Sequence, residues 1–361
     1  MSDTACDTVA IENPGDICDM EPAGAHPDHR RRTYDVLAAR LAAMGDDQVA
    51  ALLAPTDSWR VNGHGNQSGV IDIESAKVFV KKIALTDLER TMENARSTAN
   101  LFGLPLFYQY GVGSAGFGAW RELRAQLRAS GWALSGEHPH FPVAYHWRVL
   151  PRAARPPSAE VLARIQRGVD HWERSDAVRA RLEAVATAAA SIVLFIEYAP
   201  ETLDAWLKRK LTDGRLDAAL EATILRLHHQ WRDAAAFMNE RGMLHFDLNA
   251  FNMLTDGEQI YAADFGLALC ADFDLSSAER AFFETHRLYD RCYVDWAFVE
   301  WLAPKADPPV LTPALSARVD RCAPVANIFG NFLDRLSQGS KTTSYPAAEL
   351  EAALAMQPDA R

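Results

Sequence analysis

Residues 244–269 read LHFDLNAFNMLTDGEQIYAADFGLAL and constrain the fold of this chain more than any other stretch. Three polar side chains, Asp247, Asn252 and Asp264, interrupt apolar runs, where burial of a polar group without a partner is costly. The dipeptide Asp256-Gly257 lies between two short apolar runs and predicts a β-hairpin turn. Because a hairpin brings its two ends together, we expect Asn252 and Asp264 to lie near the same open end.

Carboxylate and amide oxygens that converge beside a third acid suit Mg²⁺, which completes its shell with water and nucleotide phosphates. The letters HFDL at 245–248, then Asn252 and DFG at 264–266, resemble the catalytic loop and the D-F-G segment of protein kinases. The resemblance implies that Asp247 orients an acceptor hydroxyl and takes its proton, and that Asn252 and Asp264 bind magnesium beside ATP. A turn-capping Asp247 with a loop-starting Asp264 is the purely structural alternative.

Two upstream segments extend the resemblance. Residues 63–70, GHGNQSGV, resemble the kinase loop G-x-G-x-x-G-x-V that covers the phosphates, with the matching positions at Gly63, Gly65, Ser68 and Val70. Residues 78–81, VFVK, resemble the V-A-I-K strand, which implies that Lys81 contacts the α- and β-phosphates. An ordinary glycine turn is the alternative for the loop, and Lys82 is the alternative lysine.

The remaining site assignments also come from the resemblance. The kinase lysine pairs with a helix glutamate, for which we select Glu122, with Glu89 and Glu93 as alternatives. Residues 194–200, LFIEYAP, resemble the strand and hinge that hold adenine, which implies backbone contacts at Glu197 and Ala199. Asp295 resembles the aspartate that braces the catalytic loop from below.

Several departures limit what the resemblance carries. Phe246 replaces the arginine that pairs with a phosphorylated activation loop in the family. Asn249 stands where Ser/Thr kinases have a lysine, and Phe79 replaces a small alanine. No A-P-E motif follows the DFG segment. We therefore expect a divergent Ser/Thr protein kinase of the bacterial eukaryotic-like kind, with a small-molecule kinase of the aminoglycoside or choline type, or a nucleotide-binding pseudokinase, as alternatives. The acceptor, a protein or a small molecule carrying a hydroxyl, stays open.

The expected fold is α+β with two lobes: a small β-rich N-lobe and a larger helical C-lobe. We predict a flexible acidic tail at 1–28, a helical extension at 29–56 interrupted near Gly45, an N-lobe at 57–198 and a C-lobe at 199–361. Within the N-lobe, strands are expected over 59–85, near 141–149 and over 191–198, a helix over 119–130, and a helical insertion near 159–190. Helical spacing resumes at 203–211 and again at 216–231, where it leads to Gly242.

Composition excludes other classes of function. The 361 residues carry a net charge of -11, which argues against binding nucleic acid, because neutralising phosphates requires clustered Lys and Arg. No stretch approaches the roughly 18 apolar residues of a membrane span. The 5 cysteines are scattered and fit a reducing cytoplasm. We expect a cytoplasmic protein without a membrane contact and of undetermined oligomeric state.

Overall fold

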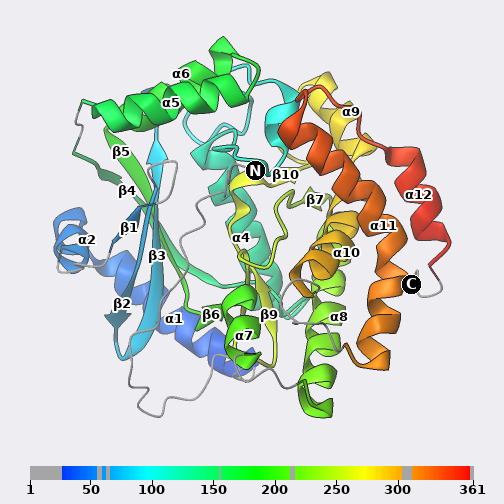
Figure 1. Ribbon diagram of the computed structural model, residues 1–361. Helices are drawn as coiled ribbons and strands as arrows, with labels where there is room; N and C mark the ends of the chain where they lie inside the picture. Colours follow the sequence, from blue (N-terminus) through cyan, green and yellow to red (C-terminus); the bar gives the residue numbers. More distant parts are fainter. Residues whose placement is uncertain are drawn as a thin grey trace.

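Alternating apolar residues build a five-stranded antiparallel sheet in the order β1-β2-β3-β5-β4. The computed structural model describes residues 27–54, 59–61, 66–153, 156–211, 216–302 and 311–357. The sheet lies on one side of the molecule and most of the helices lie on the other (Figure 1). Its strands are β1 (Arg60–Val61), β2 (Gln67–Ile73), β3 (Ala76–Leu85), β4 (Ala144–Pro151) and β5 (Ala190–Glu197).

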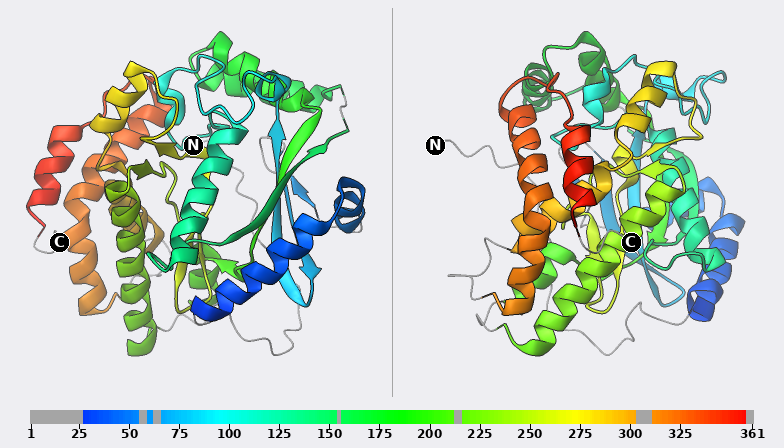
Figure 2. Two further views of the ribbon diagram at one scale, coloured as in Figure 1. Left: turned by 180° about the vertical axis from the view of Figure 1, so that it is seen from behind. Right: turned by 90° about the vertical axis from the view of Figure 1, so that its right-hand side faces the viewer.

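One face of this sheet is covered by helices α1 (Pro27–Ala43) and α2 (Asp46–Leu53). Leu37 and Leu41 of α1 pack in one buried cluster with Val80 and Phe195 of the sheet. The helices are separated at Gly45, as predicted, and α1 begins inside the tail expected for 1–28. Seen from behind, α1 runs diagonally across the sheet (Figure 2).

The other face packs against α4 (Ala119–Ser135), which lies between the sheet and the helical region (Figure 1). Trp120 and Leu123 of α4 join Ile83 and Leu194 of the sheet in a second cluster. The helix predicted for 119–130 is therefore confirmed, and it continues one turn further. The short helices α3 (Asp87–Arg90) and η1 (Leu106–Gln109) precede it.

The insertion predicted near 159–190 is two helices rather than one. Helix α5 (Ala159–His171) and helix α6 (Asp176–Thr187) follow β4 and precede β5 in the chain, and they pack against each other. Glu173 and Arg174 have positive φ values of 57° and 55°, which no right-handed helix contains, so the chain reverses there. Ala190, the last residue of the predicted insertion, already belongs to β5.

The hairpin predicted around Asp256-Gly257 is confirmed. Strand β8 (Met253–Thr255) pairs with β9 (Ile260–Ala262) in antiparallel register, with Met253 opposite Ala262. Strand β6 (Glu201–Thr202) completes this small sheet, and β7 (Met243–Leu244) pairs with β10 (Leu269–Cys270). The short helix η2 (Phe265–Leu267) follows β9.

Helices supply the rest of the larger half and its main core, in which Trp231, Phe246 and Phe298 are fully buried. None of the helices within the described ranges is long and apolar enough to cross a membrane. The helices are α7 (Leu203–Lys210), α8 (Ala218–Glu240), α9 (Ser277–Thr285), α10 (Tyr289–Leu302), α11 (Pro313–Gln338) and α12 (Ala347–Ala355).

Candidate functional site

Lys81 and Lys82 are neighbours on β3, and strand geometry sends their side chains to opposite faces. Lys81 reaches across to α4 and to the end of β9: its Nζ lies 2.7 Å from Glu122 Oε1 and 2.8 Å from Asp264 Oδ1. Lys82 instead lies over the ring of Trp59, with Nζ 3.6 Å from the ring centroid. The structure thus brings Lys81, Glu122 and Asp264 together and leaves Lys82 outside the group.

The alternative glutamates have other positions. Glu89 is buried and its carboxylate accepts from Ala119 N at 2.6 Å, at the start of α4, while forming an ion pair with Arg181 at 3.0 Å. Glu93 is exposed. Because Glu89 holds the N-terminus of the helix that carries Glu122, it positions the pair without joining it.

Charge is unevenly shared around Lys81. Burial opposes the ammonium, but the carboxylates of Asp264 and Glu122 outweigh burial and raise the pKa of Lys81 above its ordinary value. Burial raises the pKa of Glu122, and the nearby charge of Asp264 adds to that rise. Burial also favours neutral Asp264, but Lys81 outweighs it and lowers the Asp264 pKa. The negative charge therefore concentrates on Asp264, whose side chain is 46% exposed and accessible to a ligand.

The loop from His245 to Asn252 holds Asp247 in a ring of donors. Asn249 Nδ2 donates to Asp247 Oδ1 at 2.8 Å, and Asn252 Nδ2 donates to Oδ2 at 2.8 Å. The Tyr293 hydroxyl of α10 donates to Oδ1 over a longer 3.4 Å. Asn249, which stands where a lysine was expected, thus contributes a neutral donor to the aspartate.

Asn252 and Asp264 lie at the same end of the β8–β9 hairpin. Ala263 N donates to Asn252 O at 2.9 Å, so the residue before Asp264 is paired directly with Asn252. The Asn252 amide nitrogen faces Asp247, which leaves its side-chain oxygen as an acceptor. Asp264 has a left-handed backbone with φ 63°, a conformation that is strained for any residue other than glycine.

Asp247 combines burial with a surplus of negative charge. Burial raises its pKa to about 7, the charge of Asp264 acts in the same direction, and the hydrogen bonds from Asn249, Asn252 and Tyr293 oppose the rise. A carboxylate that titrates near neutral pH is suited to general-base chemistry. One ammonium among three carboxylates also leaves negative charge that a divalent cation would offset, so the donor set of Asn252 and Asp264 fits Mg²⁺.

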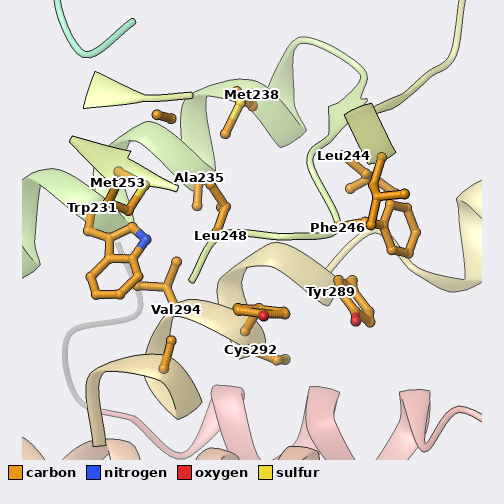
Figure 3. Close-up of a cluster of buried hydrophobic side chains, with 14 of the residues drawn as sticks. Trp231, Ala235, Met238, Leu244, Phe246, Leu248, Met253, Tyr289, Cys292 and Val294 are labelled. Atoms are coloured by element: carbon orange, nitrogen blue, oxygen red, sulfur yellow. The ribbon is translucent and has the colours of Figure 1, made fainter. Parts of the chain in front are cut away.

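The residue that braces the loop is Asp290, and the assignment of Asp295 was wrong. Asp290 is fully buried on α10, and its carboxylate accepts from His245 N at 2.6 Å and Phe246 N at 2.9 Å. These two bonds hold Phe246 in a left-handed conformation with φ 65°. The Phe246 ring turns toward Tyr289, with centroids 4.5 Å apart (Figure 3). A buried Asp at the start of an aromatic helix is the only sequence signal for this role.

Asp295 lies one and a half turns further along α10 and faces the helical core instead. It accepts from Gln357 Nε2 at 2.9 Å and lies 3.4 Å from Arg232 Nε. Within the described ranges, its carboxylate, His228 and Cys322 form the only group of three buried ligand atoms within 4.8 Å of one another. Arg232 already supplies positive charge at this position, so we assign no metal to it.

The sheet presents an apolar surface beside Lys81. Register places Ser68 opposite Lys81, and Phe79 between Val70 and Ile196, so all five side chains share one face by alternation. Val70 is 37% exposed there. Gly63 and Gly65, the other predicted loop positions, lie outside the described residues.

Glu197, one of the two predicted hinge contacts, ends strand β5. Its backbone N–H donates to Val143 O at 2.8 Å, and its carboxylate forms an ion pair with Arg30 of α1 at 2.5 Å. The N–H of Glu197 is therefore committed to the sheet and its side chain to α1, so the predicted backbone contact with adenine would fall to the Glu197 carbonyl. Ala199 follows the end of β5 and is the remaining predicted contact.

Sequence reasoning missed the segment at 99–118, which precedes α4 and passes directly over the loop from His245 to Asn252. A Cβ on Gly111 would lie 2.8 Å from Asp247 Oδ1 and 3.1 Å from Phe246 O, and one on Gly116 would lie 2.4 Å from Gly266 O. Only glycine permits such close approach to a neighbouring backbone. The run GVGSAG at 111–116 was the signal that could have revealed it.

This segment is anchored in the helical region. Tyr110 packs among Phe246, Phe282 and Tyr289, and its hydroxyl lies 2.7 Å from His286 Nε2. Burial lowers the His286 pKa to about 4, and its Nδ1 lies 2.7 Å from Phe282 O, so neutral His286 accepts from Tyr110.

Two further anchors are polar. Gln109 Nε2 donates to Leu267 O, beside the DFG segment, and Thr98, the residue just before the segment, donates through Oγ1 to Asp274 at 2.9 Å. With the aromatic packing of Tyr110, they make the segment part of the core.

Comparison with protein-family models gives no match, and comparison with curated proteins gives none. The functional assignment therefore rests on the geometry above.

Proposed function

We propose that this chain is an ATP- and Mg²⁺-dependent phosphotransferase that moves the γ-phosphate of ATP to a hydroxyl. One observation carries the proposal: a continuous series of contacts joins Lys81, Asp264, Asn252 and Asp247. These residues come from three separate places, which are strand β3, the end of β9 and the loop before β8. A structural role explains one buried acid, but it does not explain an exposed Asp264 beside an Asp247 that titrates near neutrality.

The arrangement of elements supports a two-lobed protein-kinase-like fold. On this proposal the five-stranded sheet and α4 form the N-lobe of 57–198, and the helical region forms the C-lobe of 199–361. Lys81 and Glu122 come from the first part and Asp264 from the second, so the ion pairs of Lys81 span the boundary. Ligand sites often lie at such a boundary.

The chemistry assigned to the chain is positioning and proton removal. The acceptor oxygen attacks the γ-phosphorus, its O–H proton passes to Asp247, and the bond from γ-phosphorus to the β,γ-bridging oxygen breaks with its electron pair leaving on ADP. Lys81 binds the α- and β-phosphates. Asn249 and Asn252 hold the Asp247 carboxylate in place through their 2.8 Å hydrogen bonds.

Asn252 and Asp264 would hold the magnesium, which when bound neutralises charge on the phosphates. The exposed face around Val70 and Phe79 would cover the adenine, with Ala199 at its edge. Binding of ATP would draw Lys81 away from Asp264, because a metal and a phosphate compete for both charges.

The test is transfer of labelled γ-phosphate from ATP to casein, to the protein itself and to a panel of small alcohols, amines and sugars. We expect magnesium-dependent transfer to one class, and roughly a 10²–10⁴-fold loss in Asp247→Asn. That substitution removes the proton acceptor, and it also turns an amide N–H toward the side-chain amide of Asn249 or Asn252. Label on proteins supports the Ser/Thr protein kinase interpretation, and label on small molecules alone supports the small-molecule alternative.

A pseudokinase is the second candidate, favoured by the departures at Phe246, Asn249 and Phe79. Magnesium-dependent thermal stabilisation by ATP, with no transfer to any acceptor, would support it and contradict the enzyme proposal. Loss of that stabilisation in Lys81→Ala would show that the nucleotide occupies the site described here.

A further inference from the structure

A cavity of about 150 Å³ is lined by Gly111 and Tyr293, two residues that approach Asp247. Its walls come from the 99–118 segment, α10 and α11, and they include Gly111, Tyr289, Tyr293, Trp296 and Asp334. A cavity of this volume holds a molecule about the size of benzene, or roughly six non-hydrogen atoms. It is too small for a peptide and large enough for a small alcohol.

Two of its walls touch the proposed base. The Tyr293 hydroxyl lies 3.4 Å from Asp247 Oδ1, and Gly111 approaches the same oxygen so closely that it has no room for a Cβ. The long contact from Tyr293 is weak and readily exchanged. A hydroxyl at this end of the cavity would take the place of the Tyr293 hydroxyl on Asp247.

The chemistry of the walls favours a cation. Three aromatic rings, of Tyr289, Tyr293 and Trp296, line the cavity, and the rings of Tyr293 and Trp296 meet edge to face at 87°. Asp334 is the charged residue of the lining and is exposed at its rim. Aromatic faces attract a positive charge, most strongly where water is excluded, and a carboxylate adds to that attraction.

Tyr289 belongs to the wall of the cavity but lies behind its surface, because its side chain is 0% exposed. Its hydroxyl has no hydrogen-bond partner among the residues that the structure describes. An occupant would reach that hydroxyl only if the wall moved, so the accessible aromatic surface comes from Tyr293 and Trp296.

We infer that this cavity is the acceptor site and that it takes a small alcohol carrying a positive charge, of the amino-alcohol or quaternary-ammonium class. The inference rests on the proposed phosphotransfer at Asp247. The 99–118 segment supports it, because Gly111 forms a wall of the cavity and approaches Asp247 Oδ1, while Tyr110 and Gln109 anchor the segment next to it.

The experiment uses the full chain with Mg²⁺-ATP and three probes. Choline carries the charge and the hydroxyl, 3,3-dimethyl-1-butanol is its uncharged analogue, and tetramethylammonium has the charge without the hydroxyl. We expect ADP and a phosphorylated product from choline, a kcat/KM roughly tenfold lower for the uncharged alcohol, and inhibition by tetramethylammonium that competes with choline.

A matched pair of tryptophan variants locates the effect. Trp296→Leu should raise the KM for choline and remove its advantage over the uncharged alcohol, with an unchanged KM for ATP. Trp59→Leu alters a tryptophan on the far face of the sheet, under Lys82, and should change neither value.

Failure of this inference differs from failure of the proposed function. Transfer of phosphate to casein or to the protein itself, with no response to choline or tetramethylammonium, would overturn the acceptor assignment and leave the phosphotransferase intact. If no acceptor is phosphorylated, the proposed function fails. Thermal stabilisation by choline but not by the uncharged alcohol, lost in Trp296→Leu, then still decides whether the cavity binds a cation.

Discussion

The two sides of Asp247 are built from different kinds of contact. On the proposed nucleotide side, defined by Lys81, Glu122 and Asp264, one ammonium is held between two carboxylates at 2.7 Å and 2.8 Å. On the proposed acceptor side, defined by Gly111, Tyr293 and Trp296, aromatic rings and a close backbone approach replace charge pairs.

The difference explains why one side of the site is visible in the sequence and the other is not. On the proposed function, charge pairs would recognise phosphate and metal whatever the acceptor, so that side follows a recurring sequence pattern. Shape and aromatic surface would select the acceptor, so the other side follows no pattern that spacing alone reveals. Substitutions on each side should therefore separate effects on ATP from effects on the acceptor.

Lys81→Ala should give the largest effect, and it should alter the kinetics for ATP without altering binding of the acceptor. Removing the ammonium leaves Glu122 and Asp264 without their partner, and we expect kcat/KM for ATP to fall roughly 10²–10³-fold. Lys82→Ala is the matched control, because its side chain lies on the other face over Trp59, and steady-state kinetics should change less than about twofold. Equal losses in both variants would contradict the assignment of Lys81.

The pH profile comes second, because it reports on the base that both sides share. Asp247 has to be ionised to accept a proton, and burial together with the charge of Asp264 raises its pKa to about 7. We therefore expect kcat/KM to fall about tenfold for each pH unit below 7. The kcat profile should move to lower pH, since bound Mg²⁺ favours the carboxylate. A flat profile between pH 5 and pH 8 would argue against Asp247 as the base.

Gly111→Ala tests the acceptor side. Its Cβ would lie 2.8 Å from Asp247 Oδ1, so the carboxylate has to move, and we expect kcat to fall up to roughly a hundredfold with an unchanged KM for ATP. Gly131→Ala, in helix α4 with open space around it, should leave the kinetics unchanged and stabilise the fold by about 0.5–1 kcal/mol. A raised KM for ATP in Gly111→Ala would contradict the assignment of Gly111 to the acceptor side.

Asp290→Asn should have the smallest effect, on stability first. An amide cannot accept both backbone N–H groups, so unfolding should cost about 1–3 kcal/mol less at pH 6. Burial raises the Asp290 pKa to about 7 against the two N–H bonds, so the folded protein retains a proton that the unfolded chain has lost. Wild-type stability therefore falls as pH rises toward 7, whereas the variant lacks this titration.

Denaturant titration at pH 6 and pH 8 should show the gap between wild type and Asp290→Asn narrowing at the higher pH. Asp295→Asn, on the same helix but facing Arg232, should leave turnover unchanged. A gap that widens with pH would contradict the direction of the Asp290 pKa shift.

The sequence by itself determined the parts of the site that depend on local structure. The Asp256-Gly257 turn and the apolar runs around it were enough to bring Asn252 and Asp264 to one end of a hairpin, because turn geometry and strand period are local. Alternation along β3 likewise separated Lys81 from Lys82. The helix of Glu122 followed from its own spacing, and so did the break at Gly45.

Only the tertiary structure decided contacts between distant segments. Asp290 and Asp295 look alike in sequence, and the rotation of α10 against the loop decided that Asp290 braces His245 and Phe246. The ion pair between Glu197 and Arg30, which is far away in sequence, likewise follows from how α1 packs on the sheet. The path of the 99–118 segment over Asp247 depends on where Tyr110 finds an aromatic core, and no local propensity encodes that packing.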